Sequence, residues 1–135
     1  MDKTSHFEQL LRAAAAQPEP QRLLFVFATA ELPEDATPAQ RERFSAGGGG
    51  TLTPLMSVDK GADELAGFDE LVAESREAGP PWQVVFAAGL AGRHGHPPSA
   101  MQIERALETM AERVRRGMID SMLALDPSGE ALHFL

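Results

Sequence analysis

The stretch Leu23-Leu24-Phe25-Val26-Phe27-Ala28 decides the fold that we expect for this chain. It is short and continuously apolar, whereas a strand that buries only one face alternates apolar and polar residues. Unbroken apolar character predicts a strand covered on both faces, as in a parallel sheet flanked by helices. The run Val84-Val85-Phe86-Ala87-Ala88 has the same character and predicts a second strand of this kind.

Helix signals separate these runs. Capping boxes at Ser5–Glu8 and Ser99–Gln102 open the first and last helices. Apolar residues at helical spacing from Leu65 to Val72 predict another helix, which ends at Gly79-Pro80-Pro81. The segment Thr37-Pro38-Ala39-Gln40 has proline and glutamine where a short helix would begin.

Further strands are expected on both sides of the last helix. Residues 52–58 alternate apolar and polar side chains, and Pro54 places this strand at a sheet edge or at a bulge. Residues 119–125 and 131–135 predict a C-terminal β-hairpin, because Asp126-Pro-Ser-Gly129 suits a tight turn. We therefore expect one α/β domain over 1–135. It would have a mixed, mostly parallel sheet of about five strands with helices packed on it, and a flexible glycine-rich loop around 45–50.

Composition excludes several classes of function. The 135 residues include no cysteine, which rules out disulfides, thiolate metal sites and cysteine nucleophiles. The net charge of −8 has no basic cluster within it, which disfavours nucleic acid and anionic membranes as partners. No apolar run approaches the roughly 20 residues of a membrane span, and no secretory signal is visible, so we expect a cytoplasmic protein.

The segment Gly89-Leu-Ala-Gly-Arg-His-Gly-His-Pro-Pro-Ser99 is the best candidate for a functional loop. Its glycines would let the backbone approach an anion, the Ser99 helix start would offer free N–H groups, and Arg93 would clamp the negative charge. The glycine spacing matches neither a P-loop nor a dinucleotide fingerprint, so a simple glycine-rich connector is the competing interpretation.

In a parallel sheet, the loops after the buried strands meet at one edge. The expected ligand-binding candidates at that edge are Glu31, Asp59, Lys60, Arg93, His94, His96 and Ser99. Such a set of carboxylate, histidine, lysine and arginine side chains is able to carry out acid–base chemistry, although exposed loops commonly contain the same residues. We expect no metal, because two histidines need at least one further ligand, and no motif for a cofactor or a catalytic nucleophile is present.

Three segments carry a family resemblance: QPEPQRLLFVFATAELP (17–33), LTPLMSVDK (52–60) and GPPWQVVFAAGL (79–90). Together they resemble small bacterial proteins that are catalogued as "ribonucleotide reductase subunit alpha". That activity requires a radical cysteine and a reducing cysteine pair, and this chain has no cysteine. The resemblance implies no catalytic residue in this chain.

Two hypotheses of function follow. The first is a non-catalytic protein-interaction or regulatory module whose partner is another protein or a second copy of the chain. The second is a small-ligand or enzyme site around residues 89–99, which requires the loops near 31–37, 59–63 and 91–99 to converge on a pocket. A homodimer would form through the last strand, 131–135, if its apolar edge is uncovered and pairs with another chain. The competing interpretation is that this strand lies inside the sheet or is shielded by the 31–50 loop.

Overall fold

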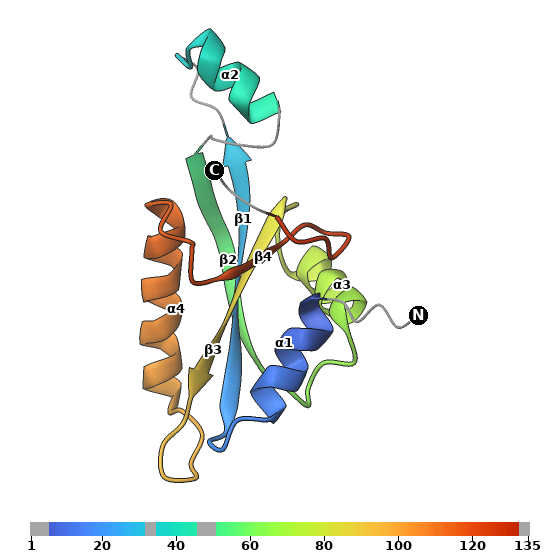
Figure 1. Ribbon diagram of the computed structural model, residues 1–135, viewed down its shortest axis with the longest axis vertical. Helices are drawn as coiled ribbons and strands as arrows, with labels where there is room; N and C mark the ends of the chain where they lie inside the picture. Colours follow the sequence, from blue (N-terminus) through green and yellow to red (C-terminus); the bar gives the residue numbers. More distant parts are fainter. Residues whose placement is uncertain (1–5, 32–34, 46–50, 133–135) are drawn as a thin grey trace.

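The computed structural model describes residues 6–31, 35–45 and 51–132, which form one sheet with helices on both faces (Figure 1). The elements follow in the order α1 (His6–Ala15), β1 (Gln21–Glu31), α2 (Pro38–Ser45), β2 (Thr51–Gly61), α3 (Phe68–Ala78), β3 (Val84–Ala91), α4 (Ala100–Arg115) and β4 (Leu123–Leu125). Residues 46–50 of the loop expected to be flexible, and 133–135 of the expected last strand, lie outside the described residues. None of the described helices is long and apolar enough to cross a bilayer.

Within the described residues the sheet has four strands in the order β2-β1-β3-β4, and every neighbouring pair is antiparallel. The prediction of a mostly parallel sheet of about five strands is therefore wrong. An unbroken apolar strand reports only that both of its faces are covered, and helices on the two faces cover an antiparallel strand equally well. The connection from β1 to β2 is a long hairpin that carries α2 beyond the end of the sheet (Figure 1), not a helical crossover.

The central strand β1 sends alternate side chains into two separate apolar clusters. Leu23, Phe25 and Phe27 belong to a cluster that includes Phe7 of α1 and Leu71 of α3. The intervening residues 24, 26 and 28 belong to a second cluster, which includes residues 110 and 114 of α4. Helices α1 and α3 thus cover one face and α4 covers the other, which explains why β1 has no polar position between residues 23 and 28.

Strand β2 confirms the expectation drawn from Pro54. It lies at one end of the strand order, with β1 as its only neighbour in the described sheet. The register slips opposite Phe27 and Ala28, which pair with Met56 and Pro54, so that Leu55 is the extra residue of a bulge. Proline is tolerated here because an edge strand at a bulge does not need every N–H for its ladder.

The C-terminal turn lies where the sequence places it, but the strand before the turn is much shorter than the predicted 119–125. The Asp126 carboxylate accepts hydrogen bonds from the Ser128 N–H and Oγ–H (2.9 and 2.6 Å) and from the Glu130 N–H (3.0 Å). Strand β4 has only 3 residues, and the described residues after the turn contribute one isolated bridge, from Ala131 to Leu125. Because β4 is this short, residues 88–91 of β3 have no strand neighbour on their outer side among the described residues.

Candidate functional site

The centre of the candidate loop is a tight two-residue turn. Arg93 and His96 exchange both backbone hydrogen bonds, each 2.9 Å long. The two residues between them have positive φ angles, 54° at His94 and 78° at Gly95. Positive φ at both central positions defines a type I′ turn, the turn that best matches the twist of a β-hairpin. The turn type alone therefore accounts for the positive φ angles of His94 and Gly95.

The glycines of this loop have structural reasons to be glycine. A Cβ atom on Gly92 would lie 1.8 Å from the carbonyl oxygen of His96, so any side chain would force the turn open. The Gly95 N–H donates to a carboxylate oxygen of Glu19 at 2.8 Å. A carboxylate of the chain itself thus occupies the amide that an incoming anion would use.

Ser99 serves as the N-cap of α4. Its Oγ accepts from the Gln102 N–H at 3.2 Å, and the Gln102 side chain accepts from the Ser99 N–H at 2.8 Å. The predicted capping box is confirmed. It occupies the N–H groups of Ser99 and Gln102, which an anion bound at this helix start would need.

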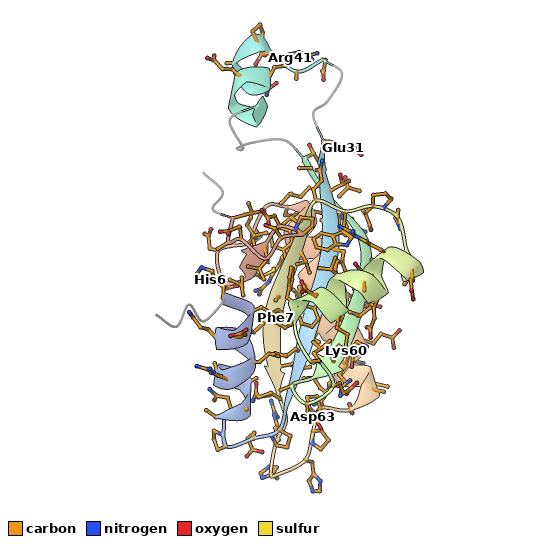
Figure 2. The ribbon with its side chains drawn as sticks, turned by 90° about the vertical axis from the view of Figure 1, so that its right-hand side faces the viewer. His6, Phe7, Glu31, Arg41, Lys60 and Asp63 are labelled. Carbon is orange, nitrogen blue, oxygen red and sulfur yellow. The ribbon has the colours of Figure 1, made fainter. Side chains whose placement is uncertain are left out.

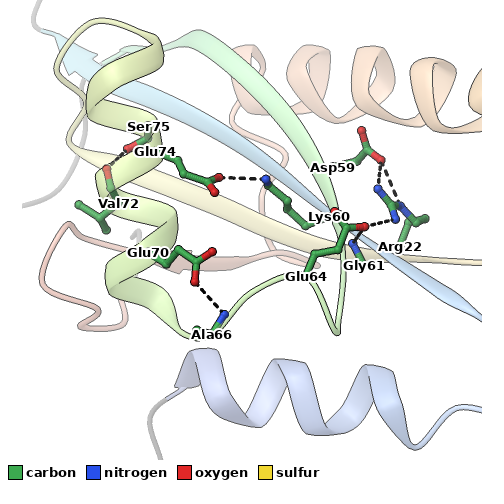
Figure 3. A network of polar contacts seen from close by, with 10 residues as sticks. All are labelled: Arg22, Asp59, Lys60, Gly61, Glu64, Ala66, Glu70, Val72, Glu74 and Ser75. Carbon is green, nitrogen blue, oxygen red and sulfur yellow. Dashed lines mark hydrogen bonds and ion pairs between the residues drawn. The ribbon is translucent and has the colours of Figure 1, made fainter.

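Asp59 and Lys60 are neighbours in sequence but face opposite sides of the sheet (Figure 3). On the α4 side, Arg22 donates to Asp59 Oδ2 through Nε (3.1 Å) and Nη2 (2.7 Å), and to Glu64 Oε1 through Nη1 (2.6 Å). On the opposite side, Lys60 Nζ lies 2.9 Å from Glu74 Oε2 of α3. Each candidate charge is therefore already paired, Asp59 with Arg22 and Lys60 with Glu74.

These pairings shift the ionisation of the groups involved. Burial lowers the pKa of Arg22, but its hydrogen bonds to Asp59 and Glu64 outweigh this effect and raise the pKa. The Gly61 N–H, followed by the Arg22 guanidinium, lowers the pKa of Glu64. The hydrogen bond to Glu74 raises the pKa of Lys60. All three shifts favour the charged form, as a structural ion-pair network requires and a proton-transfer site does not.

Glu31 lies at the other end of the sheet. Arg22 pairs with Gly61 on one side and Leu90 on the other, so the ends of β2 and β3 lie together at the start of β1. Glu31 is nine strand residues further along, about 30 Å away. Figure 2 shows Glu31 near α2, far from Lys60 and Asp63. The three loops therefore do not all converge: the loops after β2 and β3 leave at one end of the sheet and the loop after β1 leaves at the other, because β1 runs antiparallel to both of its neighbours.

The histidines of the loop lie in exposed positions of the turn. Among the described residues no group of three or more histidine, aspartate or glutamate side chains is placed to hold a metal ion. Ligand binding by Arg93, His94, His96 and Ser99 stays a prediction.

A different feature adjoins the second half of β3. This strand has 8 residues, but β4 pairs only with Val85, Phe86 and Ala87. Residues 88–91 pair with β1 on their inner side and have no strand neighbour among the described residues on their outer side. Figure 1 shows β3 continuing past β4 toward the start of α4.

A groove of 310 Å³ lies between this open half of β3 and helix α4, and we call it the α4–β3 groove. The residues that line it are Leu24, Ala88, Gly89, Leu90, Arg105, Ala106, Thr109, Met110, Arg113, Ser121 and Met122. Its floor is apolar, and its two charged residues are Arg105 and Arg113, both exposed on α4. Neither guanidinium has an ion pair or hydrogen bond with any residue that the structure describes.

Two other hollows differ from this groove in their charges. The hollow of 390 Å³ between β2 and α3 contains Lys60 and Glu74, which neutralise each other. The hollow of 690 Å³ beside α1 and the start of α3 includes carboxylates of Asp69, Glu70 and Glu130. Of these three hollows, the α4–β3 groove alone combines an apolar floor with unpaired positive charge and an open strand edge.

Sequence reasoning missed Arg22, Arg105 and Arg113. The two α4 arginines lie beside the apolar stripe of the last helix, which is a signal that a helical projection contains. Nothing in the sequence shows that β4 stops short and leaves room in front of them. Comparisons with protein families, with curated proteins and with solved structures find no match for this chain.

Proposed function

We propose that this protein is a non-catalytic protein-interaction module that takes up an extended segment of another protein in the α4–β3 groove. The observation that carries the proposal is the outer edge of residues 88–91, which has no strand partner among the described residues and lies beside a groove with an apolar floor. An extended segment placed there would continue the sheet in the position that β4 leaves empty. Its backbone would pair with β3, and alternate side chains would enter the groove.

The dispersion of the polar loop residues supports an interaction module over an enzyme. Glu31 lies at one end of the sheet and the 93–96 turn at the other, while Asp59 and Lys60 face opposite sides and are ion-paired. A catalytic arrangement needs its acid, base and orienting groups within hydrogen-bonding reach of one substrate. The α4–β3 groove instead offers apolar area, backbone donors and acceptors, and charge at its rim, which are the elements of peptide recognition.

The test is a selection of displayed random decapeptides on the full chain, followed by titration of the isotopically labelled protein with each enriched peptide. We expect the amide resonances of residues 88–91 and of the facing part of α4 to shift. Thr109→Trp places a large ring in the groove and should abolish the shifts. Glu108→Trp is the matched control, because position 108 is exposed on the same helix but does not line the groove.

Either of two results would overturn the proposal. One is the absence of any enriched peptide. The other is enrichment of peptides that bind the Thr109→Trp protein as well as the wild type.

A further inference from the structure

The positive charge of the α4–β3 groove stands out within this chain. The protein has a net charge of −8, yet the charged residues that line the groove are both arginines. At the C-terminal end of α4, Arg115 and the C-cap residue Arg116 are paired with Glu112 at 3.2 and 3.0 Å. Arg105 and Arg113 have no such partner among the described residues, so their charge is available to an occupant. An anionic occupant would meet complementary charge here and repulsion over most of the remaining surface.

The spacing of the two arginines matches that of an extended chain. They are eight helical residues apart, which corresponds to about 12 Å along α4. Four residues of a β-strand span about 13 Å. Because four is an even number, side chains at the first and fifth positions of a strand point to the same side. Two carboxylates at these positions would therefore reach Arg105 and Arg113 together.

The middle of the groove determines which kind of side chain suits the position between the two acidic residues. Ala106 and Met110 of α4 and Leu90 of β3 line the groove between or opposite the two arginines. The third position of the same strand points to this side as well, and its side chain would enter an apolar environment. An apolar side chain there would be desolvated against these residues, whereas a charged one would lose hydration without a partner.

Resting on the proposed function, we infer that the partner segment is an extended acidic peptide of the pattern acidic–x–apolar–x–acidic. The two carboxylates pair with Arg105 and Arg113, the central side chain contacts the apolar floor, and the backbone pairs with residues 88–91. Nucleic acid fits less well, because two arginines are few for a polyphosphate that carries a charge at every nucleotide.

The experiment uses a fluorescently labelled peptide, Thr-Glu-Thr-Val-Thr-Glu-Thr, and measures its anisotropy against the full chain. Two matched peptides are compared with it: one with both glutamates replaced by glutamine, and one with the glutamates three positions apart. Each charge pair at a part-exposed site contributes a few-fold in affinity, so we expect the glutamine peptide, which loses both pairs, to bind about tenfold more weakly, and the respaced peptide, which loses one pair, to bind about threefold more weakly. Binding of the acidic peptide should also weaken as salt is raised.

The protein variants complete the test. Arg105→Glu with Arg113→Glu should reduce binding of the acidic peptide by more than about tenfold, because attraction becomes repulsion. The control is Arg12→Glu with Arg76→Glu, which changes the net charge equally on α1 and α3 and should alter affinity less than about twofold. Circular dichroism tests whether both doubly substituted chains fold. If the Arg105→Glu, Arg113→Glu protein does not fold, the Arg105→Gln, Arg113→Gln protein takes its place.

Failure of this inference and failure of the proposed function give different results. If the glutamine peptide binds as tightly as the acidic one and shifts residues 88–91, the groove is a peptide site but the acidic pattern is wrong. If the chain alone self-associates in light scattering and the Arg105→Glu, Arg113→Glu variant abolishes this, the occupant is a second copy and the inference is overturned. If no peptide binds the groove, the proposed function fails as well.

Discussion

The buried hydrogen bond between Trp82 and Ser75 yields the sharpest prediction for stability. Ser75 is 4% exposed and Trp82 is 7% exposed, and both lie where α3 packs on the sheet. The indole Nε1–H donates to Ser75 Oγ at 2.7 Å, and the Ser75 hydroxyl donates to the Val72 carbonyl at 2.6 Å. Phe27 covers the indole from the side, with ring centroids 5.0 Å apart. The indole N–H therefore relies on the serine oxygen as its buried acceptor.

Ser75→Ala removes that acceptor and leaves the N–H buried without a partner. An unsatisfied buried donor costs about 1–3 kcal/mol, so we expect the free energy of unfolding to fall by about 2 kcal/mol. For a chain of this length, 1 kcal/mol corresponds to roughly 3–5 °C in melting temperature. The expected loss is thus roughly 6–10 °C. Urea denaturation followed by circular dichroism measures the loss of free energy, and thermal unfolding measures the loss in melting temperature. Ser57→Ala, at an exposed residue of β2, is the control, with an expected change within about 0.5 kcal/mol.

A double-mutant cycle separates the hydrogen bond from general packing. Trp82→Phe keeps an aromatic ring and removes the N–H, so the further change Ser75→Ala should then cost much less than in the wild type. We expect a coupling energy of about 1 kcal/mol or more. A loss below about 0.5 kcal/mol for Ser75→Ala alone, or an equal loss in both backgrounds, would show that the hydrogen bond does not stabilise the fold.

Three further predictions concern the turn, the pH dependence and the state of association. Gly92→Ala should destabilise the protein by about 2–3 kcal/mol, because the new Cβ would open the turn and its hydrogen bonds, whereas the neighbouring Arg93→Ala should stay within about 0.5 kcal/mol in the same urea assay. Burial opposes ionisation of Asp126, but hydrogen bonds from Ser128 and Glu130 outweigh this effect and lower the pKa of the carboxyl group in the folded protein. The charged carboxylate therefore stabilises the fold at pH values above its unfolded pKa of about 3.9. This stabilisation should be lost as the pH falls through the folded pKa. Asp126→Asn should accordingly lose less stability than the wild type between pH 6 and pH 3, and an equal loss would count against the turn as its source. The C-terminal segment that begins at Ala131 should support self-association through its outer edge, and light scattering that finds only monomer at high protein concentration would exclude the homodimer.

Much of the fold follows from local sequence signals. The capping box at Ser99, the bulge near Pro54 and the turn at Asp126 all lie where residue chemistry places them. These signals are short-range, because a cap or a turn is decided by a few adjacent residues. Strand direction is not short-range. Residues 23–28 are apolar in either orientation, and the direction of the next strand depends on the path of about twenty intervening residues, which include α2.

The candidate site illustrates the same limit at the level of one loop. Gly92 and Gly95 allow a close approach and a positive φ, which are the properties that glycine contributes to anion-binding loops. In this protein the approaching atom is the His96 carbonyl oxygen and the anion is Glu19. A sequence records the need for glycine but not the identity of the atom that comes close, so a ligand loop and a tight structural turn have the same composition.

The open half of β3 arises from the length of one connection. Helix α4 has 16 residues and rises about 24 Å, nearly the length of the 8-residue strand β3, so it ends level with the start of β3. To pair with all of β3, the chain would have to return almost that whole distance before β4 begins. Residues 116–122 make two turns instead, closed by hydrogen bonds from Gly117 to Val114 and from Met122 to Ile119, and the buried Ile119 anchors them. Strand β4 therefore starts at Leu123, partway along β3, and the groove beside Arg105 and Arg113 is the space that this short connection leaves.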